Sequence, residues 1–200
     1  GATGGDVVIG AAQAGGTAGA GVEANVGMTL ETRGTGQLTI MLGGDEALRL
    51  HPDAFDADIE SEQARPPESY LGRLGLGETR GGSFLLGAWL GQELIGMIGL
   101  ERQTQAKLRH SAELNSMMVH PAHTGSGVGL MLIEAAIAEA RQALGLEQIV
   151  LRVSTSSQSA IRLYERAGFQ GCGVLPHALK LTDKTGQARY FDKLTMVLIL

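Results

Sequence analysis

The chain has 200 residues, of which 44% are hydrophobic, 18% charged and 4% aromatic, and 30 are glycine. This is enough for one globular domain with a buried core, which excludes wholesale disorder. A net charge of −5 argues against electrostatic binding of nucleic acid, and the single cysteine, Cys172, excludes an internal disulfide and a cysteine-cluster zinc site. No uninterrupted apolar run reaches the ~18 residues of a membrane helix. We expect a soluble, cytoplasmic protein.

The first 36 residues differ from the rest, since they hold 11 of the 30 glycines and few charges. They lack the basic start and apolar segment of a signal peptide. Glycine-rich chain of this kind behaves as a flexible coil. We therefore expect residues 1–36 to be a mostly disordered leader and residues 37–200 to form one domain.

The first half of that domain indicates a strand, two helices and an antiparallel meander. A short apolar strand precedes a helix that Asp45 can cap, and a weaker helix follows. Two apolar segments joined by Gly-Gln-Glu then indicate a hairpin, and a third strand completes the meander. The expected elements are the strand Leu38–Leu42, helices over 45–50 and 60–74, and strands Ser83–Leu90, Leu94–Glu101 and Ser111–Val119.

In the second half the apolar period changes from 2 to 3.6. Leu130, Ile133, Ile137 and Leu144 form one stripe of a helix that ends near Gly145. A buried-type strand, Ile149–Val153, leads to Ser157, which is placed to cap another helix. The inner face of that helix is Ala160, Leu163, Tyr164 and Ala167, and it closes at Gly168; strands follow over 171–181 and 194–200. This order predicts an α+β fold with a mixed, mostly antiparallel sheet flanked by helices.

The stretch from Val119 to Gly129, V-H-P-A-H-T-G-S-G-V-G, lies between a predicted strand and a predicted helix. Glycines let the backbone approach a ligand closely, and a helix N-terminus attracts anions. The loop has no Lys or Arg, so a phosphate would rest on backbone dipoles and the Thr124 hydroxyl. The sequence therefore predicts a phosphate or pyrophosphate site.

Three other interpretations of this loop differ in how well they fit. A P-loop needs Gly-Lys-Ser/Thr, which is absent. A dinucleotide site needs G-x-G-x-x-G and an acidic residue about 20 residues on, near the end of the next strand. Here the spacing is G-x-G-x-G and the next strand ends in Val153-Ser154, so this interpretation is weak. A glycine-rich helix entry that binds no ligand stays open.

The segment from Ser157 to Phe169, S-x-x-A-I-R-L-Y-E-R-A-G-F, alone describes an amphipathic helix with a buried tyrosine. Together with the glycine loop it resembles the GNAT superfamily of acyl-CoA-dependent N-acetyltransferases. The loop is similar to the family's Q/R-x-x-G-x-G/A element and the helix to its N-x-x-A-x-x-L-Y-x-x-x-G-F element. Thr124 stands where the family usually has Arg or Gln, and Ser157 where it often has Asn.

This resemblance implies a GNAT-like three-layer fold and acetyl-CoA as co-substrate, with no metal. It implies that acetyl-CoA is held by Met117, Met118, Val119, Thr124, Gly125, Gly127, Val128, Gly129 and Ser157. Glu113 is the implied general base and Tyr164 the implied general acid toward the leaving thiolate. Asp192, Glu101 or a bound water without a fixed base are the rivals of Glu113.

The implied reaction is acetyl transfer to a primary amine of a small molecule, an amino-acid-like substrate or a peptide, without a covalent enzyme intermediate. The alternatives are a non-catalytic acyl-CoA-binding or sensor module and an interaction domain that has lost the ligand. Acceptor specificity is expected in 51–82 and in the last hairpin. The C-terminal strands could pair between subunits as a homodimer.

The remaining residues with reactive or aromatic side chains suggest structural roles. Cys172 has no apparent base nearby and is interpreted as a small buried residue. His120 and His123 lack a third metal ligand close in sequence. Trp89 is interpreted as a core residue, with lining of the acceptor pocket as the second interpretation.

Overall fold

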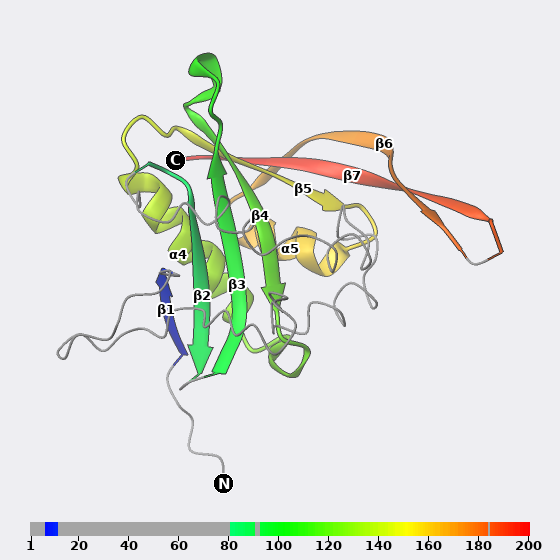
Figure 1. Ribbon diagram of the computed structural model, residues 1–200, viewed down its shortest axis with the longest axis horizontal. Coiled ribbons are helices and arrows are strands. Elements are labelled where there is room, and N and C mark those ends of the chain that lie inside the picture. Colours follow the sequence, from blue (N-terminus) through cyan, green and yellow to red (C-terminus); the bar gives the residue numbers. More distant parts are fainter. Residues whose placement is uncertain (1–6, 12–80, 91–92, 184) are drawn as a thin grey trace, which may run out of the picture.

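The computed structural model describes residues 7–11, 81–90, 93–183 and 185–200 (Figure 1). Strands β2 (Phe84–Leu90) and β3 (Glu93–Arg102) form an antiparallel hairpin, and β4 (Ser111–Val119) pairs antiparallel with β3. The predicted meander is thereby confirmed. The strand and the two helices predicted over 38–42, 45–50 and 60–74 lie outside the described residues.

Strand β1 (Val7–Ala11) pairs antiparallel with β2, from Val7 opposite Leu90 to Ala11 opposite Leu86. It lies inside the segment 1–36 that we expected to be a disordered leader, so that expectation is wrong for these residues. The run V-V-I is apolar and β-branched, which favours a strand. Pairing with β2 supplies the ladder hydrogen bonds that so short a segment cannot form alone.

The second half of the fold follows the predicted order. Helix α4 spans Val128–Gln142, strand β5 spans Gln148–Ser154, and helix α5 spans Gln158–Arg166. Strands β6 (Gln170–Thr182) and β7 (Ala188–Ile199) are longer than predicted and form a hairpin that extends beyond the rest of the sheet (Figure 1).

These strands form one sheet of seven in the order β1-β2-β3-β4-β5-β7-β6. Every pairing is antiparallel except that of β4 with β5. The parallel pairing is brief, since it joins only Ser111–Glu113 to Gln148–Val150. Beyond it β4 and β5 diverge (Figure 1). The predicted mixed, mostly antiparallel sheet is thus confirmed.

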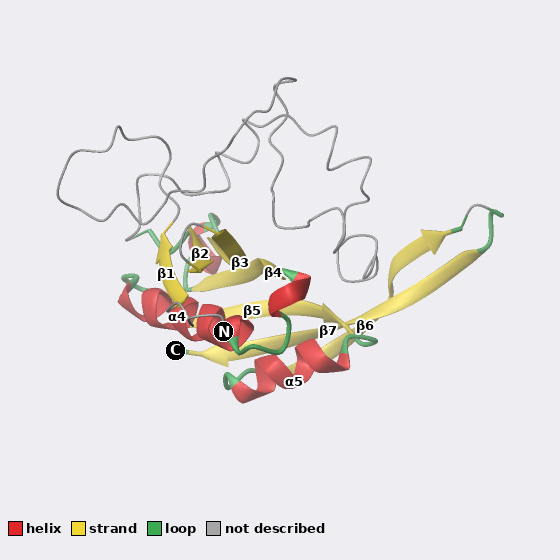
Figure 2. Ribbon diagram, turned by 90° about the horizontal axis from the view of Figure 1, so that it is seen from below, coloured by secondary structure: helices red, strands yellow, loops and turns green. Residues whose placement is uncertain are grey.

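Helices α4 and α5 lie on the same side of the sheet (Figure 2) and share one hydrophobic core with it. Gly96 on β3 lets α4 approach closely, because a Cβ there would lie 2.9 Å from Leu132 Cδ1 and 3.2 Å from Val128 Cγ1. The largest fully buried side chains of the core come from β3, α4, β5 and β7; they are Ile95, Ile98, Leu100, Leu132, Ile133, Ile149, Leu151 and Met196.

Two single-residue expectations have different outcomes. Trp89 is buried, which confirms it as a core residue, although it lies outside the main cluster. Cys172 is exposed, so the expectation that it is buried is wrong. It lies on β6, which forms the edge of the sheet, and its thiol donates to the Thr195 carbonyl at 3.5 Å.

Within the described ranges, no helix is long and apolar enough to cross a membrane.

Candidate active site

The glycine loop between β4 and α4 has the backbone conformation that its sequence predicts. After the short 3₁₀ helix Pro121–His123, Gly125 and Gly127 have φ of +81° and +93°. Residues other than glycine rarely adopt such a backbone conformation. Apart from the glycine itself and its two neighbours in the chain, no heavy atom of the described residues would lie within 4 Å of a Cβ built on either glycine. Glycine is thus needed at both positions for the backbone path, and the space beside them is open.

Several N–H groups of this loop have no hydrogen-bond partner among the residues that the structure describes. Met131 is the first helix residue to donate to a preceding carbonyl, that of Gly127. No carbonyl or side chain of the described ranges accepts from the N–H groups of Gly125, Gly127, Val128, Gly129 or Leu130. Unpaired N–H groups at a helix start attract an anion, and the helix dipole adds about half a positive charge. The predicted anion site therefore has its donors in place.

A bulge in β4 redirects the strand before it reaches the loop. Its register with β3 shifts between Gly99 opposite Asn115 and Met97 opposite Met118, and Ser116 has a φ of +52°. Such a bulge moves the following side chains to the other face of a sheet. Before the bulge Ala112 and Leu114 are buried in the core; after it Met117 and Val119 are the residues packed against it.

Three predicted parts of the site meet at Gly129, in the first turn of α4. A Cβ on Gly129 would lie 3.1 Å from Leu163 Cδ2 on α5 and 3.2 Å from Met117 Cε on β4. This glycine therefore lets α5 and the end of β4 pack against the start of α4. The residues Met117–Val119, the loop and the helix that carries Tyr164 are brought together in this way.

Tyr164 is buried, with 8% of its surface exposed, and its ring meets that of Phe169 edge-on, with 5.9 Å between centroids. Burial raises its pKa from 10.0 to about 12, because the charged phenolate loses its hydration. Its hydroxyl forms no hydrogen bond with another residue of the described ranges. Every fully buried side-chain oxygen in those ranges has a partner, so the hydroxyl oxygen of Tyr164 is not fully buried. Tyr164 is thus protonated and neutral at physiological pH.

Ser157 is at the N-cap of α5, as predicted, but its side chain makes no capping hydrogen bond. The prediction that the Ser157 side chain caps the helix is therefore wrong, although Ser157 does occupy the N-cap position. Gln158 on the first turn donates instead to the Thr155 carbonyl at 2.8 Å.

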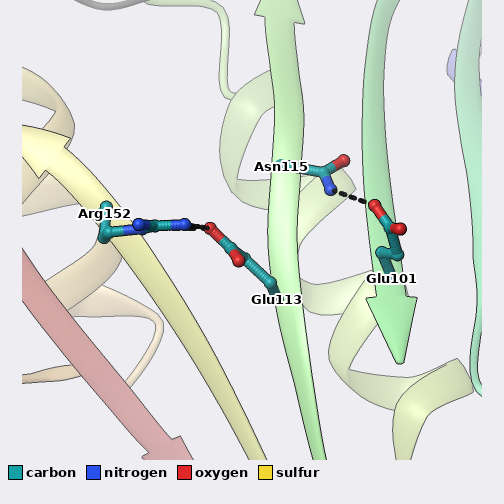
Figure 3. Close-up of polar contacts among 4 residues, drawn as sticks. All are labelled: Glu101, Glu113, Asn115 and Arg152. Atoms are coloured by element: carbon teal, nitrogen blue, oxygen red, sulfur yellow. Dashed lines mark hydrogen bonds and ion pairs between the residues drawn. The ribbon is translucent and has the colours of Figure 1, made fainter. Parts of the chain in front are cut away.

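Glu113 is half-buried on β4 and pairs with Arg152 on β5, a partner that sequence reasoning missed (Figure 3). Arg152 donates from Nη2 at 2.6 Å and from Nε at 3.1 Å, in both cases to Oε1 of Glu113. A charged residue inside the otherwise apolar run I-V-L-R-V was the available signal.

The rivals of Glu113 make contacts of their own. The Asn115 amide approaches Oε2 of Glu101 at 3.5 Å (Figure 3). The Asp192 carboxylate accepts the N–H of His177, whose φ of +53° marks a bulge in β6. Asp192 therefore stabilises the β6–β7 hairpin. Among the described residues, no group of three His, Cys, Asp or Glu could hold a metal ion.

The comparison with known proteins identifies the family. Residues 46–169 match the model of the Acetyltransferase (GNAT) family. The chain belongs to the GNAT acetyltransferases. A curated relative, a mycothiol acetyltransferase from Salinispora tropica, is 29% identical over 124 residues, which cover 62% of this chain and 38% of that protein. The matched region thus spans about two-fifths of the relative's length.

Solved structures of this family share the fold. An acetyltransferase of Streptococcus pneumoniae has a TM-score of 0.63 at 20% identity, covering 78% of this chain and 90% of that one. A protein from Salmonella typhimurium, determined with its cofactor acetyl-CoA, has a TM-score of 0.64 at 23% identity, covering 80% and 86%. The ribosomal-protein-alanine N-acetyltransferase of Brucella melitensis has a TM-score of 0.55 at 26% identity, covering 72% and 80%. These likenesses confirm the predicted α+β GNAT fold.

Proposed function

We propose that this GNAT protein transfers an acetyl group from acetyl-CoA to a primary amine by direct attack, without a covalent enzyme intermediate. The observation that carries the proposal is the meeting at Gly129 of the open loop, the end of β4 and the helix with Tyr164. The acceptor would be a small molecule, an amino-acid-like substrate or a peptide. The names of the relatives indicate different acceptors and do not choose among these classes.

The residues of the loop fit a diphosphate. The N–H groups that no described residue accepts, and the open space beside Gly125 and Gly127, are suited to an anion that approaches the backbone closely; these N–H groups belong to Gly125, Gly127, Val128, Gly129 and Leu130. Thr124 and Ser157 would add hydroxyl groups, while the main chain of Met117–Val119 would hold the pantetheine arm. Bound in this way, acetyl-CoA supplies an acetyl group activated as a thioester.

Glu113 is the proposed general base. An alkyl amine with a pKa near 10.4 is mostly protonated at pH 7, and forming the neutral nucleophile costs about 4.6 kcal/mol. A carboxylate can accept that proton directly or through water. Met117 lies four residues beyond Glu113, and the bulge at Ser116 makes their separation less than the ~13 Å of a regular extended strand. We therefore propose that the proton reaches Glu113 through water.

Tyr164 is the proposed acid for the leaving sulfur. Its pKa of about 12 keeps the hydroxyl protonated throughout the neutral range. Complete proton transfer to a thiolate with a pKa near 8.5 would be uphill by about 5 kcal/mol. The main contribution of Tyr164 is thus a hydrogen bond that stabilises the negative charge developing on sulfur.

The direct test is to incubate the protein with acetyl-CoA and a pool of primary amines and to measure release of free CoA thiol. We expect thiol release that depends on amine and falls about 10²-fold or more in Glu113→Gln. CoA should also raise the melting temperature, because ligand at 100 times its Kd stabilises by about 2.7 kcal/mol. Stabilisation without thiol release would refute catalysis and support the acyl-CoA-binding module. The absence of both stabilisation and thiol release would support an interaction domain.

The biological setting is proposed on the same basis. We propose a cytoplasmic protein whose partners are its amine substrate and, through the C-terminal strands, a second copy. Strand β6 lies at the edge of the sheet and exposes Val174 and Leu175, which supports pairing between subunits. Light scattering at micromolar concentration tests this, and a monomer would refute it.

A further inference from the structure

Arg152 holds the Glu113 carboxylate in an asymmetric way. Both of its hydrogen bonds to this carboxylate, from Nη2 at 2.6 Å and from Nε at 3.1 Å, are to Oε1. No residue of the described ranges donates a hydrogen bond to Oε2. The guanidinium thus fixes the carboxylate through one oxygen and leaves the other available.

The position of the pair in the sheet is equally specific. Glu113 is the last residue of β4 that pairs with β5, opposite Val150. Arg152 lies two residues farther along β5, and its side chain reaches back across the point where the strands diverge (Figure 3). Because side chains alternate along a strand, Val150 and Arg152 share a face, opposite to that of the buried Leu151. The ion pair therefore bridges β4 and β5 at the end of their pairing.

We propose that Arg152 is a positioning residue that orients Glu113 so that Oε2 receives the proton of the acceptor amine. This inference rests on the proposed function, in which Glu113 is the base. The proton leaves the ammonium group, passes through water and forms an O–H bond at Oε2, while the guanidinium keeps all its protons. A glutamate without this contact would rotate about its side-chain torsions and spend less time in the productive geometry.

Exposure separates this role from a structural one. The side chains of Arg152 and Glu113 are 51% and 30% exposed. Ion pairs exposed to this degree contribute little to folding stability, because water and salt screen them. Loss of Arg152 should consequently affect turnover more than folding.

The test measures kcat and KM of the full chain with acetyl-CoA and an amine that the wild type acetylates. The variants are Arg152→Gln, Arg152→Lys, Glu113→Gln and the double variant with Gln at both positions. Arg141→Gln is the matched control, since this arginine is exposed in the last turn of α4, at the end of the helix opposite to the glycine loop. Melting temperatures with and without CoA establish that each variant folds and binds.

We expect Arg152→Gln to lower kcat about tenfold or more, because misplacing a catalytic group by about 1 Å can cost 10²-fold. The KM for acetyl-CoA should not change, and Arg152→Lys should restore part of the loss. In the Glu113→Gln background the second substitution should have no further effect, because Arg152 acts only through Glu113.

The outcomes separate the two proposals. A wild type that acetylates no amine, or Glu113→Gln with wild-type kcat, would overturn the proposed base and this inference with it. A slow Glu113→Gln variant beside an unimpaired Arg152→Gln variant would overturn the inference alone. Losses that multiply in the double variant would also overturn it, since Arg152 would then act independently of Glu113.

Discussion

Replacing Tyr164 by Phe should change how the stability of the protein depends on pH. Phe keeps the edge-on contact with Phe169, whose ring centroid lies 5.9 Å away, so the variant should fold. In the unfolded chain a tyrosine titrates near 10.0, whereas burial raises the pKa of Tyr164 to about 12. As the pH rises above 10, the unfolded state releases this proton before the folded state does. Stability present below pH 10 is therefore lost as the pH rises toward 12.

The size of this effect follows from the two pKa values. Between pH 9 and pH 11 the wild type should lose about 1.4 kcal/mol through Tyr164, and the full difference of about 2.7 kcal/mol is reached only above pH 12. Urea unfolding at pH 9 and pH 11 measures it, with Tyr190→Phe as the control because that tyrosine is 51% exposed. Between these two pH values, Tyr164→Phe should lose about 1.4 kcal/mol less stability than the wild type. Equal losses in the wild type and Tyr164→Phe would refute the burial of the hydroxyl in a neutral form.

The remaining predictions concern the same region. Tyr164→Phe should lower kcat with little change in the KM for acetyl-CoA, as measured by thiol release; an unchanged kcat would remove its role as acid. Thr124→Arg should lower the Kd of CoA about 3- to 10-fold in calorimetry by adding a charge-assisted contact, and an unchanged Kd would mean that this position does not face phosphate. Gly129→Val should cost about 1–3 kcal/mol in urea unfolding, because its Cβ would meet side chains at 3.1 and 3.2 Å. Gly173→Ala, where a Cβ meets nothing within 4 Å, should cost far less, and equal costs would contradict the packing at Gly129.

Elements set by local periodicity were predictable from the sequence. The stripe of apolar residues indicated α4, although its last predicted member, Leu144, lies beyond the end of the helix and is 90% exposed. Alternation with short turns indicated the hairpin of β2 and β3. The two positive φ values of the glycine loop likewise follow from its composition, because the backbone path there needs glycine. These features depend on residues close together in the chain.

Features that depend on distant residues were missed. Strand β1 exists through its pairing with β2, more than 70 residues later in the chain. Arg152 meets Glu113 across 39 residues of sequence, and nothing local to either residue specifies the partner. The exposure of Cys172 follows from the place of β6 at the edge of the sheet, which the apolar composition of that strand does not reveal.

The proposed function requires that main-chain N–H groups of the glycine loop bind the diphosphate of CoA. Calorimetric titration of CoA into Gly127→Asp tests this directly, because the substitution places a negative charge at that position. Gly186→Asp is the matched control. Gly186 has a similar φ, +86° against +93°, and equally open space beside it, but it lies in the turn between β6 and β7. We predict wild-type affinity for Gly186→Asp and no measurable binding for Gly127→Asp. A folded Gly127→Asp variant that binds CoA with wild-type affinity would contradict the account.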